Sequence, residues 1–224
     1  MTSSSSAFLT RLQQPDLDAL ARRWTVRSYR HNEAIIAHRD PGRDVFFLLE
    51  GRARVTLFSD SGKEIAYRDV GHGEIFGELA GIDGKPRSAS VVALESARAA
   101  RLPEAAFRDM VATHPVFAWA LLVHLSAQLR RMTDRVFEYS TLVVRKRLIL
   151  ELLREAAESE PLDGQPCICP APSHVELAAK ISSHREAISR EMSSLAKKGL
   201  IAKRGNRIVL CRPETLELLV ASDE

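Results

Sequence analysis

The residues best suited to chemistry lie in one short stretch, residues 71–91, where glycines, a carboxylate and a guanidinium occur close together. Gly77 lets the backbone approach a ligand closely. Glu78 opens a segment that can form a helical turn, whose free N–H groups attract an anion, and Arg87 adds a permanent positive charge. Because a carboxylate repels a phosphate, we expect Glu78 to accept a hydrogen bond from a ribose hydroxyl. The stretch therefore predicts a site for a small phosphorylated sugar.

Two other interpretations of this stretch compete on spacing alone. Gly71, Gly73 and Gly77 come near to a dinucleotide-binding fingerprint, but the spacing differs and no strand-helix-strand unit with a later acidic residue follows. The second alternative is a glycine-rich turn with an incidental surface pair between Glu78 and Arg87.

The order of residues at 76–80 (Phe-Gly-Glu-Leu-Ala) and 86–89 (Pro-Arg-Ser-Ala) closely resembles the phosphate-binding cassette of the cyclic-nucleotide-binding domain. Cyclic AMP receptor proteins share this cassette with the regulatory subunits of cyclic-nucleotide-dependent kinases. The resemblance implies that Glu78 holds the ribose 2′-hydroxyl and that Arg87, with Ser88, holds the cyclic phosphate. The cassette residues expected at the ligand are Gly77, Glu78, Leu79, Arg87, Ser88 and Ala89.

The composition is that of a globular chain with room for one large domain or two small ones: 224 residues, 45% hydrophobic, with a net charge of +3. No signal-peptide pattern and no apolar stretch of membrane-spanning length occurs, so we expect a cytoplasmic protein. Cys167, Cys169 and Cys211 are too few for a disulfide framework. The spacing of the first two is not that of a structural zinc site, and we predict no metal.

Residues 25–102 predict a series of short strands, after a polar tail at residues 1–14 and a short helix at residues 16–24. Apolar or alternating runs recur through this region and are separated by turn signals such as Pro41-Gly42. Strands at such regular spacing indicate an antiparallel barrel or sandwich. The family resemblance favours a jelly-roll β-barrel, in which the cassette is the connection that departs from strand geometry.

After Pro103 the hydrophobic period becomes helical, with a short helix at residues 104–113 and a long helix that Pro115 can open. From Ala118 onward, apolar residues recur at alternating steps of four and three, which is a heptad seam. The members of this seam are Ala118, Leu122, Leu125, Leu129, Met132, Val136, Tyr139 and Val143. The seam predicts a parallel homodimer. The alternative is an amphipathic helix that packs on its own barrel.

The C-terminal part of the chain predicts a winged helix-turn-helix. Ser173 and Glu176 form a capping-box pattern at the start of one helix, and we expect the hinge between domains near residues 138–142. The predicted elements are a helix at 140–157, a proline-rich loop at 158–172, helices at 173–181 and 184–198, and a two-stranded wing at 200–201 and 208–210.

Residues 172–211 carry eight basic and three acidic residues, which suggests a polyanionic partner. Residues 177–179 (Leu-Ala-Ala) and 185–190 (Arg-Glu-Ala-Ile-Ser-Arg) strongly resemble the DNA-reading helix of cyclic AMP receptor-type regulators. In that family the first Arg, the Glu and the second Arg of this run contact base edges. The residues expected at DNA are Ser183, His184, Arg185, Glu186, Ser189, Arg190, Lys203 and Arg204. Ordinary helix packing with a solvated basic face is the alternative.

The residue types on this helix also suggest a DNA sequence. Arginine pairs with O6 and N7 of guanine, and glutamate accepts from the amino group of cytosine. The resemblance makes TGTGA, with its inverted TCACA, the favoured half-site. Ser189 resembles the residue at this position in the oxygen-sensing branch of the family, which reads TTGAT. Arg185 favours the TGTGA half-site instead.

Together these features predict an α+β chain in three parts. Residues 1–114 form a cyclic-nucleotide-binding domain, residues 115–139 a dimerisation helix and hinge, and residues 140–224 a winged helix-turn-helix DNA-binding domain. The predicted function is a homodimeric transcription regulator, with double-stranded DNA and RNA polymerase as partners and no membrane. No catalytic constellation is present in the sequence, so an enzyme is not expected.

The base of the nucleotide is less well defined than its sugar and phosphate. In cyclic AMP receptor proteins, polar residues of the long helix from both subunits meet the adenine, and aligning the helices places Met132, Thr133 and Asp134 there. This match is incomplete, so cAMP is the favoured effector and cGMP stays open.

Three alternatives for the function remain. The chain could sense oxygen, haem or a metal instead of a nucleotide, although the intact set of Glu78, Arg87 and Ser88 argues against this. It could bind DNA constitutively and keep only a vestigial pocket. It could also be a ligand-binding adaptor whose partner is a protein rather than DNA.

Overall fold

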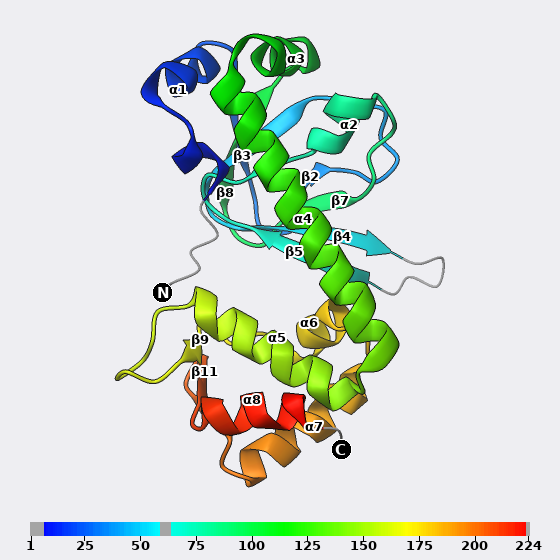
Figure 1. The fold of residues 1–224 in the computed structure, drawn as a ribbon, viewed down its shortest axis with the longest axis vertical. Coiled ribbons are helices and arrows are strands. Elements are labelled where there is room, and N and C mark those ends of the chain that lie inside the picture. Colours follow the sequence, from blue (N-terminus) through cyan, green and yellow to red (C-terminus); the bar gives the residue numbers. More distant parts are fainter. Residues whose placement is uncertain (1–6, 59–63, 223–224) are drawn as a thin grey trace. The chain divides into compact units, whose positions relative to one another are not determined.

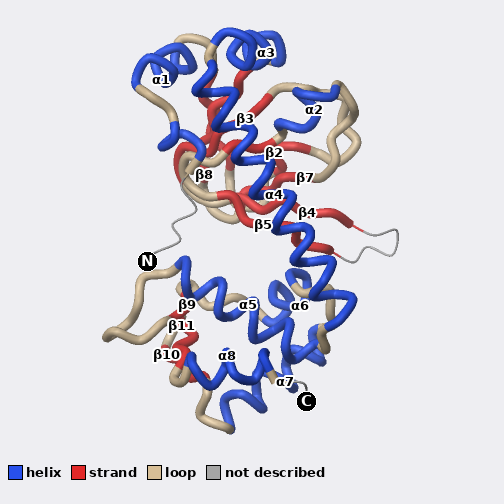
Figure 2. Tube along the Cα trace, viewed as in Figure 1, coloured by secondary structure: helices blue, strands red, loops and turns tan. Residues whose placement is uncertain are grey.

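The computed structural model describes residues 7–58 and 64–222, which fall into two compact units. We call Ser5–Arg130 the N-terminal unit and Arg131–Glu224 the C-terminal unit. Figure 1 labels the elements of each unit, and Figure 2 distinguishes their helices from their strands. The boundary falls inside one long helix, so this helix contributes residues to both units.

The N-terminal unit contains two antiparallel sheets of four strands each. The first has the strand order β1-β8-β3-β6, and the second has the order β2-β7-β4-β5. The strands are β1 (Thr25–Tyr29), β2 (Ala34–Ile36), β3 (Val45–Glu50), β4 (Ala53–Phe58), β5 (Glu64–Val70), β6 (Ile75–Phe76), β7 (Ser90–Ala93) and β8 (Ala97–Leu102).

The predicted antiparallel strands are confirmed, but the predicted closed barrel is not. A barrel needs an unbroken ladder of hydrogen-bonded strands around its circumference. Among the described residues, the strands form two separate sheets instead. The first sheet ends at β6, which has two residues, and the second ends at β2, which has three. Strands this short offer few backbone groups for pairing, and among the described residues the longer edge strands β1 and β5 do not pair with the other sheet either.

Strand β3 is buried on both faces and separates two hydrophobic cores. Because side chains alternate across a strand, Val45 and Phe47 join a core beneath the helices, whereas Phe46 and Leu48 join the core between the two sheets. Phe46 stacks on Phe76, with 5.4 Å between the ring centroids. A strand in this position is almost continuously apolar rather than alternating.

Helical segments pack on the first sheet and complete the core beneath them. These segments are η1 (Phe8–Arg11), α1 (Gln14–Ala21), α3 (Glu104–Thr113) and the first part of α4 (Pro115–Thr141). Figure 1 shows α1 and α3 beside the start of α4.

The predicted polar tail is wrong from Phe8 onward. Phe8 is 2% exposed, and its ring meets the edge of Phe117 at a centroid distance of 5.3 Å. Leu12 is also buried. A single 3-10 turn is too short to display a hydrophobic period, so no sequence pattern indicates this turn. Residues 1–6 of the predicted tail lie outside the described residues.

Helix α4 runs unbroken from Pro115 to Thr141. It ends within the interval predicted for the hinge, so Val143 of the predicted seam lies beyond the helix. Three seam residues at intervals of seven, Leu122, Leu129 and Val136, are 56%, 70% and 65% exposed. Leu125, between the first two, packs on the core of the N-terminal unit.

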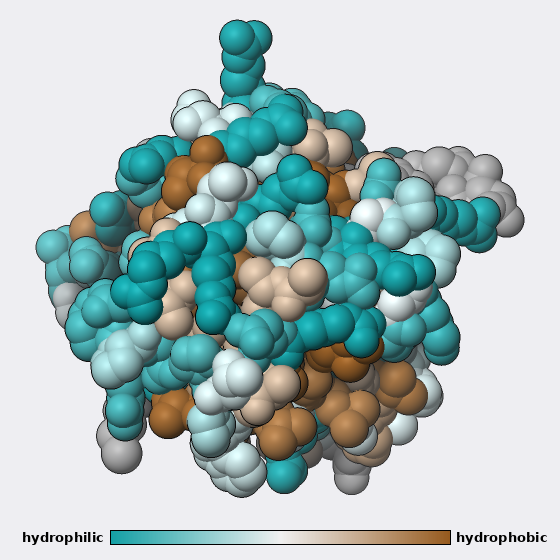
Figure 3. Space-filling model, turned by 90° about the horizontal axis from the view of Figure 1, so that it is seen from above, coloured by the Kyte–Doolittle hydropathy of each residue, from teal (hydrophilic) through white to brown (hydrophobic). Residues whose placement is uncertain are grey.

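Two surface properties bear on possible partners. The face seen from above is mostly hydrophilic; its largest group of hydrophobic side chains lies toward the lower margin of the view, and smaller ones are scattered elsewhere (Figure 3). Among the described residues, no single helix is both long and apolar enough to cross a membrane. Helices α3 and α4 meet that criterion only as a pair, across a bend of 106°.

The C-terminal unit combines helices with a three-stranded sheet. Its elements after α4 are α5 (Val144–Glu158), β9 (Cys167–Ile168), α6 (His174–Lys180), α7 (Arg185–Lys197), β10 (Ile201–Arg204), β11 (Arg207–Leu210) and α8 (Pro213–Ala221). The capping box is confirmed, since Ser173 Oγ accepts from the Glu176 N–H at 3.2 Å and Glu176 Oε2 accepts from the Ser173 N–H at 2.8 Å. The predicted helix-turn-helix and wing are confirmed as α6, α7 and the β10–β11 hairpin.

Two features of this unit differ from the prediction. Residues 158–172 are not wholly a loop, because β9 pairs with β11 and places Cys167 opposite Val209. A strand of two residues is too short to produce an alternating pattern. Helix α8 had no predicted counterpart, and its Leu216 is fully buried in the core of the unit.

Buried ion pairs join the last turns of α4 to α5. Arg135 donates from Nη2 to Glu151 Oε2 at 2.7 Å, and Arg154 donates to both carboxylate oxygens of Glu138. Glu138 and Glu151 are each 4% exposed, so both carboxylates are shielded from solvent. We call these four residues the α4–α5 ion-pair network. Arg154 Nη1 also lies 3.7 Å from Glu151 Oε2, so the two pairs are connected, and removing a partner of a buried carboxylate should destabilise the fold.

Candidate functional site

The connection after β6 brings the backbone close to an arginine side chain. Gly77 has a φ of +76° and immediately precedes α2 (Glu78–Asp83), which begins at Glu78. A Cβ atom at Gly77 would lie 2.8 Å from Arg87 Nη1 and 2.8 Å from Ile36 Cδ1. Both the positive φ and the lack of space therefore require glycine here.

Arg87 is 6% exposed and anchored by backbone carbonyls. Its Nη1 donates to Gly77 O at 2.8 Å, and its Nη2 donates to Asp44 O at 2.6 Å. The guanidinium also lies over the ring of Phe46, 5.8 Å from the centroid. Burial lowers the pKa of Arg87, an effect that the carboxylates of Asp44, Asp40 and Glu78 oppose. An arginine remains charged under these conditions, so the fold holds a fixed positive charge beside the start of α2.

Glu78 is 5% exposed at the start of α2. Burial raises the pKa of its carboxyl group, while the positive charges of Arg68 and Arg87 lower it. Arg68 lies on β5, where its Nη2 donates to Ile75 O at 3.0 Å and its Nη1 lies 3.5 Å from Glu74 Oε2. Sequence reasoning missed Arg68, although it precedes the stretch 71–91 by only three residues, because it lies on a strand and belongs to no motif.

Helix α4 places a second group of polar side chains near Glu78. His124 Nε2 lies 3.9 Å from Glu78 Oε1, and the two side chains are 10% and 7% exposed. Gln128, one turn further along the helix, has its Nε2 at 3.0 Å from the same ring nitrogen. Sequence reasoning missed both residues, although a His and a Gln four positions apart must share one face of a helix.

The remaining predicted ligand residues differ in exposure and in the unit to which they belong. Leu79 is 47% exposed, Ser88 is exposed and Ala89 is partly buried. Met132, Thr133 and Asp134 lie on α4 beyond Arg130 and belong to the C-terminal unit, whereas the cassette belongs to the N-terminal unit. The structure therefore does not gather the two predicted groups within one unit.

The predicted DNA-reading residues lie on α7 and at its start. His184 is the N-cap residue, and Arg185, Glu186 and Arg190 are exposed. Ser189 is partly buried, and its hydroxyl lies 2.8 Å from Nδ1 of His174 on α6. Ser183 is 6% exposed, which favours a packing role for its side chain.

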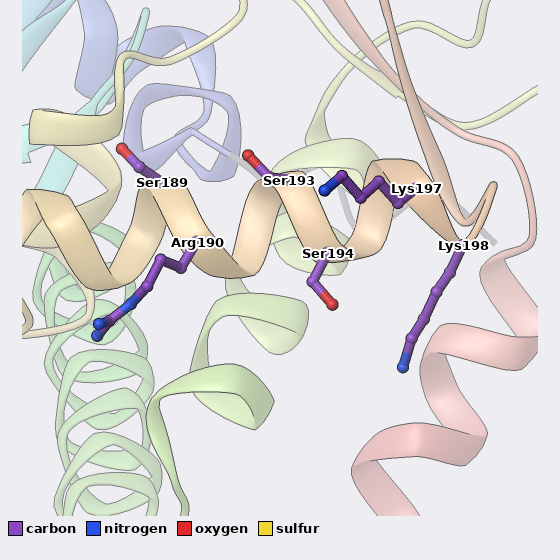
Figure 4. A pocket seen from close by; sticks show the side chains of 6 residues that line it. All are labelled: Ser189, Arg190, Ser193, Ser194, Lys197 and Lys198. Carbon is purple, nitrogen blue, oxygen red and sulfur yellow. The ribbon is translucent and has the colours of Figure 1, made fainter.

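An open hollow of about 660 Å³ runs along the later part of α7. Figure 4 shows Ser189 and Ser193 on one edge of the helix and Arg190 and Ser194 on the other. The hollow is lined by Ser189, Arg190, Ser193, Ser194, Lys197 and Lys198. Hydroxyl and cationic groups on one helix suit a polyanionic surface. The prediction omitted Ser193, Ser194, Lys197 and Lys198, although spacings of three and four from Arg190 could have found them.

The wing carries further positive charge. Strands β10 and β11 pair antiparallel, with Arg204 opposite Arg207, and Gly205 in the connecting turn has a φ of +58°. Lys203 and Arg204 are both exposed. In the part of the chain that the structure describes, no three His, Cys, Asp or Glu side chains are placed to hold a metal ion.

Comparison with known proteins identifies both parts of the chain. Residues 26–114 match the cyclic nucleotide-binding domain family, and residues 146–219 match the Crp-like helix-turn-helix domain. The chain is 23% identical over 199 residues to the CRP-like cAMP-activated global transcriptional regulator of Mycobacterium tuberculosis, covering 88% of this chain and 89% of the relative. It is 28% identical over 193 residues to the cyclic AMP receptor protein of Thermus thermophilus, covering 85% of each.

A solved structure shows the same fold at lower identity. The c-di-GMP responsive global regulator CLP of Xanthomonas campestris has a TM-score of 0.79 at 20% identity, covering 88% of this chain and 99% of that one. The curated relatives are transcription regulators rather than enzymes. With a cyclic nucleotide-binding domain followed by a Crp-like helix-turn-helix, this chain belongs to the Crp-Fnr family of transcription regulators.

Proposed function

We propose that this regulator is a cytoplasmic homodimer that senses a cyclic nucleotide, cAMP in preference to cGMP, and binds a palindromic DNA site of the TGTGA type. Residues 1–114 would bind the nucleotide, residues 115–139 would form the dimer helix and hinge, and residues 140–224 would bind DNA, with RNA polymerase as a further partner. The observation that carries the proposal is the burial of Glu78 and Arg87 at the two ends of one cassette.

The charges of the cassette match those of a cyclic nucleotide. Arg87 uses two of its N–H groups on carbonyls, and a guanidinium has five, so the others are available to phosphate oxygens. Glu78 supplies an acceptor for the 2′-hydroxyl of the ribose. Arg68 adds a second positive charge near that carboxylate. Burial strengthens each of these interactions, because water screens them less.

The exposed seam of α4 supports the homodimer. Leu122, Leu129 and Val136 repeat every seven residues and are each more than half exposed. A stripe with this period matches the same stripe on a second copy in a coiled coil. Burying it against a partner would remove apolar side chains from water, at roughly 25 cal/mol for each Å².

The exposed side chains of α7 support sequence-specific DNA binding. Arg185, Glu186 and Arg190 combine two bidentate donors for guanine with an acceptor for cytosine. Lys203 and Arg204 on the wing suit backbone phosphates, which position a protein without reading sequence. Two-fold symmetry would place the half-sites about one helical turn apart, roughly 34–36 Å between centres.

Calorimetric titration of the full chain tests the effector. We expect cAMP to bind more tightly than cGMP or c-di-GMP. The chain is then titrated into a fluorescent duplex that contains TGTGA and its inverted TCACA, with and without each of the three ligands. Anisotropy gives its affinity for DNA in each case. We expect cAMP to raise this affinity. Binding of none of the three would refute the sensing role, and binding that left DNA affinity unchanged would refute its coupling to DNA.

A further inference from the structure

A three-residue polar cluster lies inside the N-terminal unit, and the cassette motif does not account for it. Glu78, His124 and Gln128 come from α2 and α4, and contacts of 3.9 Å and 3.0 Å link them through Nε2 of His124. Apolar groups surround the cluster: the ring of Phe8 meets the His124 ring edge-on at 6.2 Å, and Leu125 packs on the core. Polar groups in such surroundings need partners.

The orientation of the Gln128 amide in the structure determines which hydrogen bond it makes with His124. Nε2 of Gln128 can only donate a hydrogen bond, so the histidine nitrogen that it meets must be the acceptor. With the Gln128 amide oriented as in the structure, the ring proton then lies on Nδ1. A distance of 3.9 Å to Glu78 is too long for a hydrogen bond. The carboxylate of Glu78 is thus not consumed by His124 and stays available to a ligand hydroxyl.

The other atom of the same amide, Gln128 Oε1, is buried and has no hydrogen-bond partner among the residues that the structure describes. A buried acceptor without a partner destabilises the fold, and an apolar side chain of similar shape would avoid this penalty. Packing alone is therefore a poor reason for glutamine at this position. A ligand that brings a donor to Oε1 would satisfy it.

We propose that Gln128 Oε1 accepts a hydrogen bond from the exocyclic amino group of the purine base, and that His124 is a positioning residue that orients the Gln128 amide. This inference rests on the proposed function. The base is attached to C1′ of the ribose, next to the C2′ whose hydroxyl Glu78 would hold. Gln128 is linked to Glu78 through His124, so its amide lies in the neighbourhood of the carboxylate that would hold the ribose. Adenine presents an amino group at its position 6, whereas guanine presents an oxygen that would oppose Oε1.

The test compares cAMP with its 6-deamino analogue, purine riboside cyclic monophosphate, which keeps the ribose and phosphate but lacks the amino group. Calorimetric affinities are measured for the wild-type chain, Gln128→Met and His124→Leu. We expect the wild type to prefer cAMP by roughly tenfold, the worth of one hydrogen bond that would otherwise leave a buried acceptor unpaired. Gln128→Met should bind both ligands equally, and His124→Leu should show a reduced preference.

Ser126→Ala is the matched control, because Ser126 is exposed on the same helix; it should keep the full preference. If Gln128→Met unfolds at or above the wild-type temperature, its loss of preference for cAMP is not caused by misfolding. If the wild type binds neither ligand, the proposed function itself fails. If it binds cAMP and Gln128→Met keeps the preference, or Thr133→Ala removes it instead, the assignment to Gln128 is wrong while the sensing function stands.

Discussion

Replacing Glu78 with glutamine should stabilise the ligand-free protein while weakening its binding of cyclic nucleotide. The carboxyl group is 5% exposed, and burial raises its pKa despite the opposing charges of Arg68 and Arg87. Desolvation therefore outweighs attraction, and the ionised side chain is less stable in the folded protein than in the unfolded chain. Glutamine keeps the shape of the side chain and removes the charge.

The size of the stability gain follows from linkage between folding and proton binding. Each unit by which the folded pKa exceeds the unfolded value corresponds to about 1.4 kcal/mol. For a chain of this length, about 1 kcal/mol shifts the unfolding temperature by roughly 2–4 °C. Because the folded pKa is the higher one, wild-type stability is fully present below the ordinary pKa of 4.5 and is lost as the pH rises through the folded pKa. The advantage of Glu78→Gln should thus vanish near pH 4.5 and reach a plateau at higher pH.

Binding should change in the opposite direction. A hydrogen bond from the ribose to a charged acceptor exceeds one to a neutral acceptor by about 1 kcal/mol, so Glu78→Gln should weaken cAMP binding roughly fivefold. Arg87→Ala should weaken it at least roughly thirtyfold, because it removes the charge that faces the phosphate. Asp83→Asn, on the exposed side of the same helix, is the control and should change neither property. The measurements are calorimetric unfolding across a pH series and isothermal titration.

A Glu78→Gln variant that unfolds at a lower temperature than the wild type at pH 7 would refute the reasoning about desolvation. Unchanged nucleotide affinity would show that the ribose does not meet Glu78.

Three further outcomes test the proposed function. Arg185→Ala should relax the choice of base at one guanine and cost about 1–3 kcal/mol in a selection from random duplexes, whereas Lys203→Ala should weaken all sequences alike and lower the salt slope by about one. Leu129→Glu should yield a monomer in sedimentation, because it sets like charges against each other across the seam, and should weaken DNA binding by roughly a hundredfold through lost avidity. Thr133→Ala should reduce the ratio of DNA affinities with and without nucleotide more than it lowers the unfolding temperature. A dimeric Leu129→Glu protein, a Lys203→Ala variant with altered base preference, or an unchanged ratio for Thr133→Ala would each count against the corresponding step.

The parts of the fold that the sequence predicted are those with a repeating or capped pattern. Helix α4 shows its period over many turns, and the capping box at Ser173 marks the start of α6 independently of its surroundings. Short elements carry no such signal. The turn that buries Phe8 and the two-residue strand β9 owe their structure to contacts with distant segments, which no local pattern encodes.

The same distinction applies to the candidate site. Glu78 and Arg87 lie close in the chain and share a motif, so their types and spacing are informative before any fold is known. Arg68, His124 and Gln128 reach the same neighbourhood from β5 and α4. Their proximity depends on how strands and helices pack, and no sequence pattern predicts it.

The α4–α5 ion-pair network determines at which residue a stable DNA-binding fragment should begin. A DNA-binding fragment that began at the predicted boundary, residue 140, would keep Glu151 and Arg154 but lose their partners Arg135 and Glu138. Glu151 and Arg154 would keep only their mutual contact of 3.7 Å and would be more exposed to water, so this fragment should be less stable than one that retains the α4 partners. A fragment that began at Arg131 would keep both pairs. Chimaeras that exchange DNA-binding domains between relatives should likewise carry over the last turns of the dimer helix, because these turns and α5 form one transferable piece.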